Sequence, residues 1–164
     1  MIKITMIFLA VVLTACATPN RMVYSSGFSF GNYDYVVISK PDSEKTSTTL
    51  YGMDVEFANL LSKYNMHVIG DKELTMLSPE TQKRTLITRL SVTASSNRIV
   101  LSVSFDDAIT GKTVSSITAA EKGDIFDDDD RGIALESVSK TLIKALKKDK
   151  DLQITDDKKF SLLR

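Results

Sequence analysis

The chain has 164 residues, of which 43% are hydrophobic and 26% are charged, as in an ordinary globular domain. Its 21 basic residues balance its 21 acidic residues, so no strongly basic face is expected to bind nucleic acid non-specifically. One cysteine excludes an internal disulfide, and one cysteine with one histidine supplies too few ligands for a zinc site.

The first predicted element in chain order is an apolar leader. Lys3 precedes a run of mostly apolar residues that ends at Cys16. This run is shorter than the roughly 20 residues that a membrane-spanning helix needs, and its charged start is typical of a secretory signal peptide. Residues 1–15 are therefore predicted to be removed as a signal peptide.

The end of the leader, Leu13-Thr14-Ala15-Cys16, resembles the lipobox of bacterial lipoproteins. The resemblance implies cleavage between Ala15 and Cys16, a diacylglyceryl group on the Cys16 sulfur and an acyl chain on its amino group. Alternatives for Cys16 are a buried or free thiol, or half of an intermolecular disulfide. In lipoproteins of Gram-negative bacteria, Asp after the cysteine tends to retain the protein at the inner membrane. Ala17 stands there in this chain, so the resemblance favours the outer membrane.

Residues 16–27 are mostly small and polar, and they are predicted to form the lipidated end and a tether. From Phe28 onward, aromatic residues alternate with small or polar ones, and Tyr35–Ile38 is continuously apolar. This pattern predicts a strand whose second half lies inside a sheet. A ligand-stacking surface is the alternative to a core face for the aromatic residues.

Apolar residues from Met53 to Tyr64 recur at helical spacing behind an acidic first turn, which predicts an amphipathic helix. Asn65 is expected to end this helix in the left-handed conformation. Residues 66–69 are predicted to form a short buried strand. The resulting β-α-β unit predicts parallel pairing of its two strands.

The sequence Ser78-Pro79-Glu80 predicts the start of a short helix with Ser78 as its N-cap. Apolar and polar residues then alternate from Leu86 to Ala120, with turns at Ser96-Asn97 and Thr110-Gly111. This alternation predicts a three-stranded antiparallel meander. An acidic loop over 121–130, a final amphipathic helix and a charged tail over 149–164 complete the chain.

The predicted elements give an α+β (mixed α/β) fold, in the order β-α-β-(short helix)-β-β-β-α. About five strands form a mixed sheet, two main helices pack on one of its faces, and residues 28–148 form the single domain. The element order, the lipobox and the turn from Asp106 to Thr113 are similar to small periplasmic α/β domains of bacterial lipoproteins. These are the TolB amino-terminal domain, the curli-pore lipoprotein and the lipoprotein activators of penicillin-binding proteins. The resemblance implies no catalytic residue.

Four consecutive carboxylates, Asp127–Asp130, raise the question of a Ca²⁺ site. A calcium loop of the EF-hand type needs oxygen ligands at positions 1, 3 and 5 and Glu at position 12. Counted from Asp127, position 5 is Arg131 and position 12 is Val138, so two of the required calcium ligands are missing. Asp129 or Asp130 is expected instead to cap the final helix.

His67, the sole histidine, lies between apolar residues of a predicted strand. A Ser-His-Asp triad would have to use it, but the sequence contains neither a nucleophile elbow nor a Gly-rich phosphate loop, so a structural role is expected. No catalytic, cofactor-binding or metal-binding residue is predicted.

The chain is therefore expected to be a membrane-anchored envelope lipoprotein without enzymatic activity, which binds a protein partner or contributes to an assembly. The alternative is a hydrolase or small-ligand-binding lipoprotein that uses His67 or several Asp side chains in a concave site.

Overall fold

The computed structural model describes residues 20–39, 52–95 and 97–149. Cys16, the remainder of the predicted lipobox and residues 150–164 of the predicted tail lie outside this range. In the described part, the helices are the 3₁₀ helix η2 (Phe30–Asn32) and the α-helices α3 (Met53–Lys63), α4 (Asp71–Leu74), α5 (Pro79–Gln82) and α6 (Asp128–Asp149). The strands are β1 (Arg21–Tyr24), β2 (Tyr35–Ser39), β3 (His67–Ile69), β4 (Thr85–Ser95), β5 (Arg98–Asp107) and β6 (Thr113–Lys122).

The six strands form one mixed sheet in the order β1-β6-β5-β4-β2-β3. Strand β2 pairs in parallel with β3 and β4, whereas β4, β5, β6 and β1 pair antiparallel. The prediction of an α+β fold with a mixed sheet is confirmed. Its two main parts, a parallel β-α-β unit and an antiparallel meander, are also as predicted.

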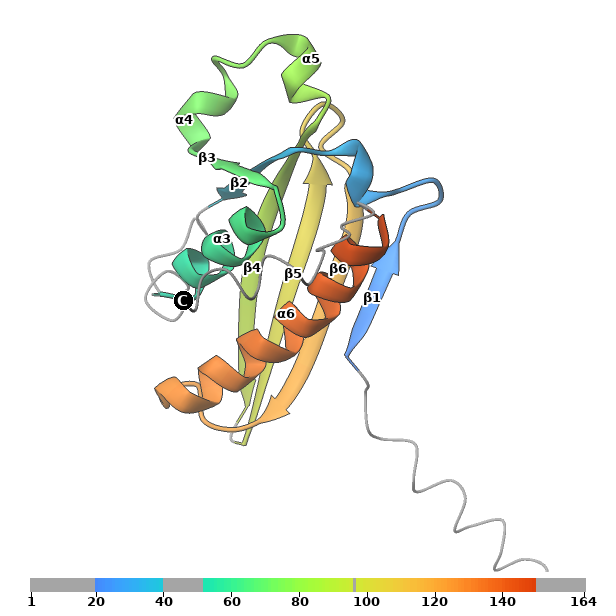
Figure 1. Cartoon of the computed structure of the whole chain (residues 1–164). Helices are drawn as coiled ribbons and strands as arrows, with labels where there is room; N and C mark the ends of the chain where they lie inside the picture. The colour runs from blue at the N-terminus through green and yellow to red at the C-terminus, as the bar shows by residue number, and fades with distance from the viewer. Residues whose placement is uncertain (1–19, 40–51, 96, 150–164) are drawn as a thin grey trace, which may run out of the picture.

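Helices α3 and α6 lie on the same face of the sheet, as predicted (Figure 1). The core between the two layers combines the apolar positions of β4, β5 and β6 with the inward faces of both helices. Phe105 of β5 lies at its centre, with ring centroids 5.2 Å from Phe30 and 6.5 Å from Phe57. Leu142 of α6 is completely buried. No helix among the described residues is long and apolar enough to span a membrane.

The opposite face of the meander is polar. Alternation along the strands places Ser91, Ser102, Thr118 and Arg89 on this face, and all four are partly or fully exposed. The hydroxyls of Ser102 and Thr118 lie 3.2 Å apart across β5 and β6. An antiparallel sheet with one buried and one wetted face has this composition.

The sheet begins earlier in the chain than predicted. Arg21–Tyr24, inside the range predicted as a tether, forms β1 and pairs with the edge of β6 opposite Ser115–Thr118. Met22 packs against the core from this strand. Four residues are too short to show a periodicity, and β1 exists because β6 offers an unpaired edge. The domain therefore extends ahead of residue 28, and its described part has six strands.

The aromatic stretch before β2 was predicted to be a strand, and this prediction is wrong. Residues Phe30–Asn32 form η2, and the Ser29 hydroxyl caps it by accepting a hydrogen bond from Gly31 N at 3.1 Å. Phe28 packs edge-on against Phe30, with ring centroids 4.8 Å apart. The aromatic side chains are thus mainly a packing cluster, and the turn lets both Phe28 and Phe30 reach the core.

Candidate functional site

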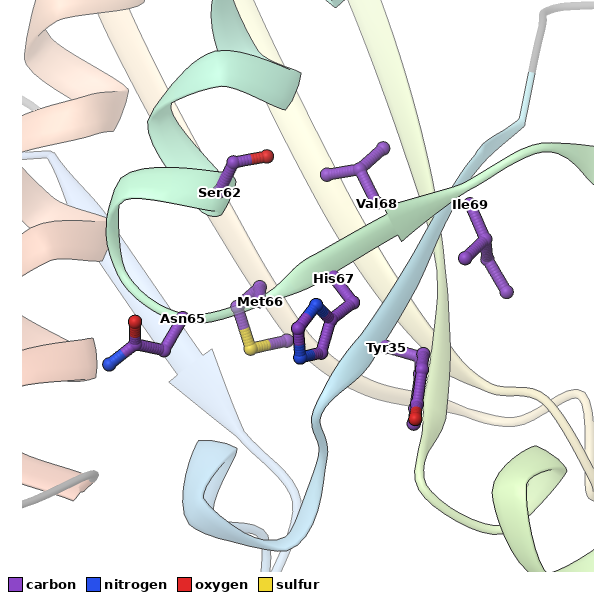
Figure 2. Close-up of a pocket in the computed structure, with 7 residues that line it drawn as sticks. All are labelled: Tyr35, Ser62, Asn65, Met66, His67, Val68 and Ile69. Atoms are coloured by element: carbon purple, nitrogen blue, oxygen red, sulfur yellow. The ribbon is translucent and has the colours of Figure 1, made fainter.

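A hollow of about 520 Å³ lies along β3 at one edge of the sheet (Figure 2). Residues from β2, from α3 and from the segment that connects α3 to β3 line it together with β3 itself. The lining residues are Tyr35, Ser62, Asn65, Met66, His67, Val68 and Ile69.

The chain reverses sharply at this hollow between α3 and β3. Asn65 has φ 59°, in the left-handed region predicted for it. Met66 is buried, and its N–H donates to Leu61 O at 3.2 Å. The next N–H, that of His67, donates to Asp34 O at 2.6 Å and begins the parallel pairing with β2. These contacts fix which side chains of β3 face outward.

His67 lies on the outer face of β3 and is exposed. Its ring lies beside that of Tyr35, the residue opposite it in β2, with centroids 5.4 Å apart and planes inclined by 36°. Val68 points to the other face and packs against the core. Strand β3 was predicted to be buried, but it is an edge strand, because no further strand follows it in the described sheet. The His67 ring is thus open to solvent at the sheet edge, beside the half-buried ring of Tyr35.

Ser62 and His67 are not arranged as a nucleophile and its base. The Ser62 hydroxyl donates to Ala58 O at 3.0 Å within α3, and Figure 2 shows Ser62 and the His67 ring on opposite sides of the β3 ribbon. The groups that the hollow offers are aromatic faces, the imidazole nitrogens, the Tyr35 hydroxyl and the Asn65 amide. Such groups bind a ligand or a partner by stacking and hydrogen bonding.

A second hollow, of about 370 Å³, lies between α3 and α6. Its lining combines Leu60 and Leu135 with the charged residues Glu56, Lys63 and Glu136. At Gly132 a side chain would meet open space. The hollow is therefore a groove with two leucines and a charged rim.

The buried carboxylate of Asp106 lies on the polar face of the sheet. Its Oδ1 accepts a hydrogen bond from the Thr113 hydroxyl at 2.7 Å, and its Oδ2 lies 3.1 Å from Nη1 of the exposed Arg89. Among the described residues, no donor makes a well-aligned hydrogen bond to Oδ2, so the Arg89 interaction is mainly electrostatic. This pair holds neighbouring strands together and is a structural contact.

Asp107 organises the turn between β5 and β6. It accepts hydrogen bonds from the Thr110 N–H at 2.8 Å, from the Thr110 hydroxyl at 2.9 Å and from the Tyr33 hydroxyl at 3.2 Å. Burial by itself raises the pKa of Asp107, but these hydrogen bonds outweigh it and lower the pKa below its ordinary value. Burial raises the pKa of Tyr33, and the charge of Asp107 and their hydrogen bond raise it further.

The four consecutive carboxylates lie at the start of α6. Asp127 Oδ1 accepts hydrogen bonds from the N–H groups of Asp129 at 2.8 Å and Asp130 at 3.3 Å. The cap is therefore Asp127, and the prediction of Asp129 or Asp130 is wrong, because α6 begins at Asp128 and a cap precedes the helix. Asp128 pairs with Arg131. Across the described ranges, no three His, Cys, Asp or Glu residues form a group able to hold a metal ion.

No protein-family model matches the sequence, and no curated protein matches it. Solved structures of similar fold include a PelC dodecamer from Paraburkholderia phytofirmans, at 14% identity and a TM-score of 0.48, covering 75% of this chain and 93% of that one. A putative neuraminyllactose-binding hemagglutinin homolog from Helicobacter pylori has 12% identity and a TM-score of 0.37, covering 86% and 94%. Lipoprotein GNA1162 from Neisseria meningitidis has 13% identity and a TM-score of 0.41, covering 69% and 99%. Likenesses of this strength carry no function from one protein to another.

Proposed function

We propose that this chain is a lipid-anchored envelope protein without enzymatic activity, whose domain binds a protein partner. The observation that carries the proposal is the leader, which ends in Leu13-Thr14-Ala15-Cys16. A thiol at this position is set to receive lipid, because a core thiol has no reason to follow a signal peptide directly. Several acyl chains on one residue hold a domain firmly at a membrane.

The most suitable surface for the partner is the edge of the sheet at β3. The exposed ring of His67 lies there on an edge strand, beside the half-buried ring of Tyr35. Edge strands accept a further strand from another chain through backbone hydrogen bonds, while neighbouring side chains select the partner. The proposed partner therefore contributes an extended segment that lies along β3.

Mass spectrometry of the protein purified from membranes tests the anchor. The expected product begins at Cys16 and carries a diacylglyceryl group and an acyl chain, whereas Cys16→Ser yields no lipidated product. Ala17→Ser is the matched control, because it keeps the lipobox and is expected to be processed normally. Recovery of an unmodified, unanchored chain would contradict the proposal.

The membrane to which the protein belongs is tested separately. The proposal assigns it to the outer membrane, because Ala17 follows the cysteine. Membrane fractionation is expected to recover the protein with outer membranes, and Ala17→Asp is expected to move it to inner membranes. Recovery of both proteins from the inner membrane contradicts this assignment.

Photo-crosslinking in intact cells tests the partner. A crosslinkable amino acid at His67 is expected to give one discrete adduct with another envelope protein. The same amino acid at Met76, which is 83% exposed in the segment between α4 and α5, serves as the control and is expected to give none. Equal products at both positions, or none at either, would remove the support for binding at β3.

A small-ligand site is the second candidate, and the hollow of about 520 Å³ beside Tyr35 and His67 favours it. In this case small molecules would raise the thermal stability of the protein. His67→Ala would lose this response while folding normally, and Met76→Ala would keep it. A screen without any ligand-dependent shift counts against this candidate.

A further inference from the structure

The first strand of the sheet begins close to the cysteine of the leader. Arg21 at the start of β1 follows Cys16 by five residues, which span at most about 18 Å when fully extended. Arg21 pairs with Thr118, and β6 continues past this position by four residues, about 13 Å, to Lys122. A lipid on Cys16 can therefore reach only about 5 Å beyond the end of β6 along the strand direction.

This end of the domain, which we call the anchor end, comprises the turn at Asn97, the end of β6 and the residues that lead into α6. The Gly123 N–H donates to Asn97 O at 3.1 Å, so the turn and the end of β6 are in contact. In Figure 1, β1 starts toward this end, and α4 and α5 lie at the opposite end of the domain. Because the connection spans at most about 18 Å, it holds Arg21 within that distance of a membrane that holds Cys16, and β1 starts toward the anchor end.

Phe126 lies at the anchor end and is 87% exposed. Its position is fixed, because its N–H donates to Asp124 Oδ1 at 3.0 Å and the Arg131 guanidinium donates to the carbonyl of Ile125. Ile125 turns toward the core and packs against it. A single exposed apolar side chain is ordinary on a protein surface. Phe126 differs in lying where the short connection to Cys16 brings the domain next to lipid.

We propose that the anchor end docks on a zwitterionic phospholipid surface, with Phe126 inserted at the boundary between headgroups and acyl chains. This inference rests on the lipid anchor of the proposed function. The choice of lipid follows from charge, since Asp124 and Asp127–Asp130 flank Phe126 in the sequence and an anionic surface would repel them. Aromatic side chains are well suited to this boundary.

Tryptophan fluorescence in vesicles tests this orientation, because the chain contains no tryptophan. Phe126→Trp and Met76→Trp each place one reporter at an exposed position, at the anchor end and at the opposite end respectively. Each lipidated protein is reconstituted in phosphatidylcholine vesicles with and without brominated phosphatidylcholine. The Phe126→Trp reporter is expected to lose about half of its fluorescence, since interfacial side chains lie roughly 5–10 Å deep. The Met76→Trp reporter is expected to keep its fluorescence.

Mass spectrometry of the same samples separates the two ways in which the inference can fail. An unmodified Cys16 overturns the proposed function, and the orientation loses its basis with it. A lipidated protein in which Phe126→Trp is not quenched, or in which Met76→Trp is quenched equally, overturns the orientation alone. Much stronger quenching of Phe126→Trp than of Met76→Trp, with less quenching when anionic lipid is added, supports the proposed orientation.

Discussion

The Arg89–Asp106 ion pair allows the stability of the sheet to be tested quantitatively. The Asp106 side chain is 2% exposed and the Arg89 side chain is 61% exposed, with 3.1 Å between charged atoms. Exposed ion pairs contribute about 0–1 kcal/mol to the free energy of unfolding, and removing one partner of a fully buried pair lowers it by about 3–5 kcal/mol. After Arg89→Met, the Thr113 hydrogen bond is the contact among the described residues that still stabilises the carboxylate. The expected loss therefore lies between these limits, at about 2 kcal/mol, or roughly 8 °C in Tm.

Urea unfolding followed by circular dichroism measures this loss. Lys140→Met is the matched control, because Lys140 pairs with Glu136 at 2.9 Å and both side chains are more than half exposed. It is expected to cost about 0.3–0.5 kcal/mol. In an Asp106→Asn background, Arg89→Met is expected to cost less than about 0.5 kcal/mol, since the buried charge is gone. If Arg89→Met and Lys140→Met destabilise the protein equally, the buried carboxylate does not depend on Arg89 and the reasoning is wrong.

The helix cap and the turn at Asp107 give two further predictions. Asp127→Ala is expected to lower the unfolding free energy by about 1 kcal/mol, because two N–H groups of α6 lose their acceptor; Asp129→Ala, the control, is expected to cost less than half of this in the same urea titration. Asp107→Asn is expected to destabilise the protein by about 1 kcal/mol near neutral pH. Because the folded state lowers the pKa of Asp107, its contribution is complete above about pH 4 and is lost as the pH falls through the folded pKa. The difference between native and variant proteins should therefore shrink in acid, and a difference independent of pH would contradict this linkage.

The meander and the β-α-β unit could be predicted because their patterns are long and regular. Alternation from Leu86 to Ala120 repeats often enough that only one register buries the apolar side chains. The amphipathic pattern of α3 ends at Asn65, whose positive φ is an intrinsic preference of this residue type. In these elements, local preference and tertiary packing lead to the same conformation.

Other elements depend on contacts that no short window of sequence contains. Strand β1 is set by the free edge of β6, and η2 is set by the packing of Phe30 on Phe105, which is distant in sequence. The aromatic alternation before β2 looks like a strand because both a strand and this turn bury alternate residues. Tertiary contacts, rather than local preference, decide between them.

The candidate site could be predicted only in part from the sequence, for the same reason. The presence of His67 in a strand followed from the sequence, but its exposure follows from the position of β3 at the edge of the sheet. Its neighbour Tyr35 follows from a register that parallel pairing alone does not specify. Conversely, the predicted cap of α6 lies two or three residues after the observed cap, Asp127. Four identical carboxylates in a row give no signal for the first helical residue.

The strand that follows the lipid anchor and the strand proposed to bind the partner lie at opposite edges of one sheet. Strand β1, which follows the anchor, and strand β3, which borders the hollow, are the first and last strands in the order. Five spacings of about 4.8 Å separate them by roughly 24 Å. A membrane at the anchor end and an extended segment on β3 can therefore be bound at the same time. Substitutions at Phe126 and at His67 should accordingly act independently, with additive effects on membrane contact and on partner binding.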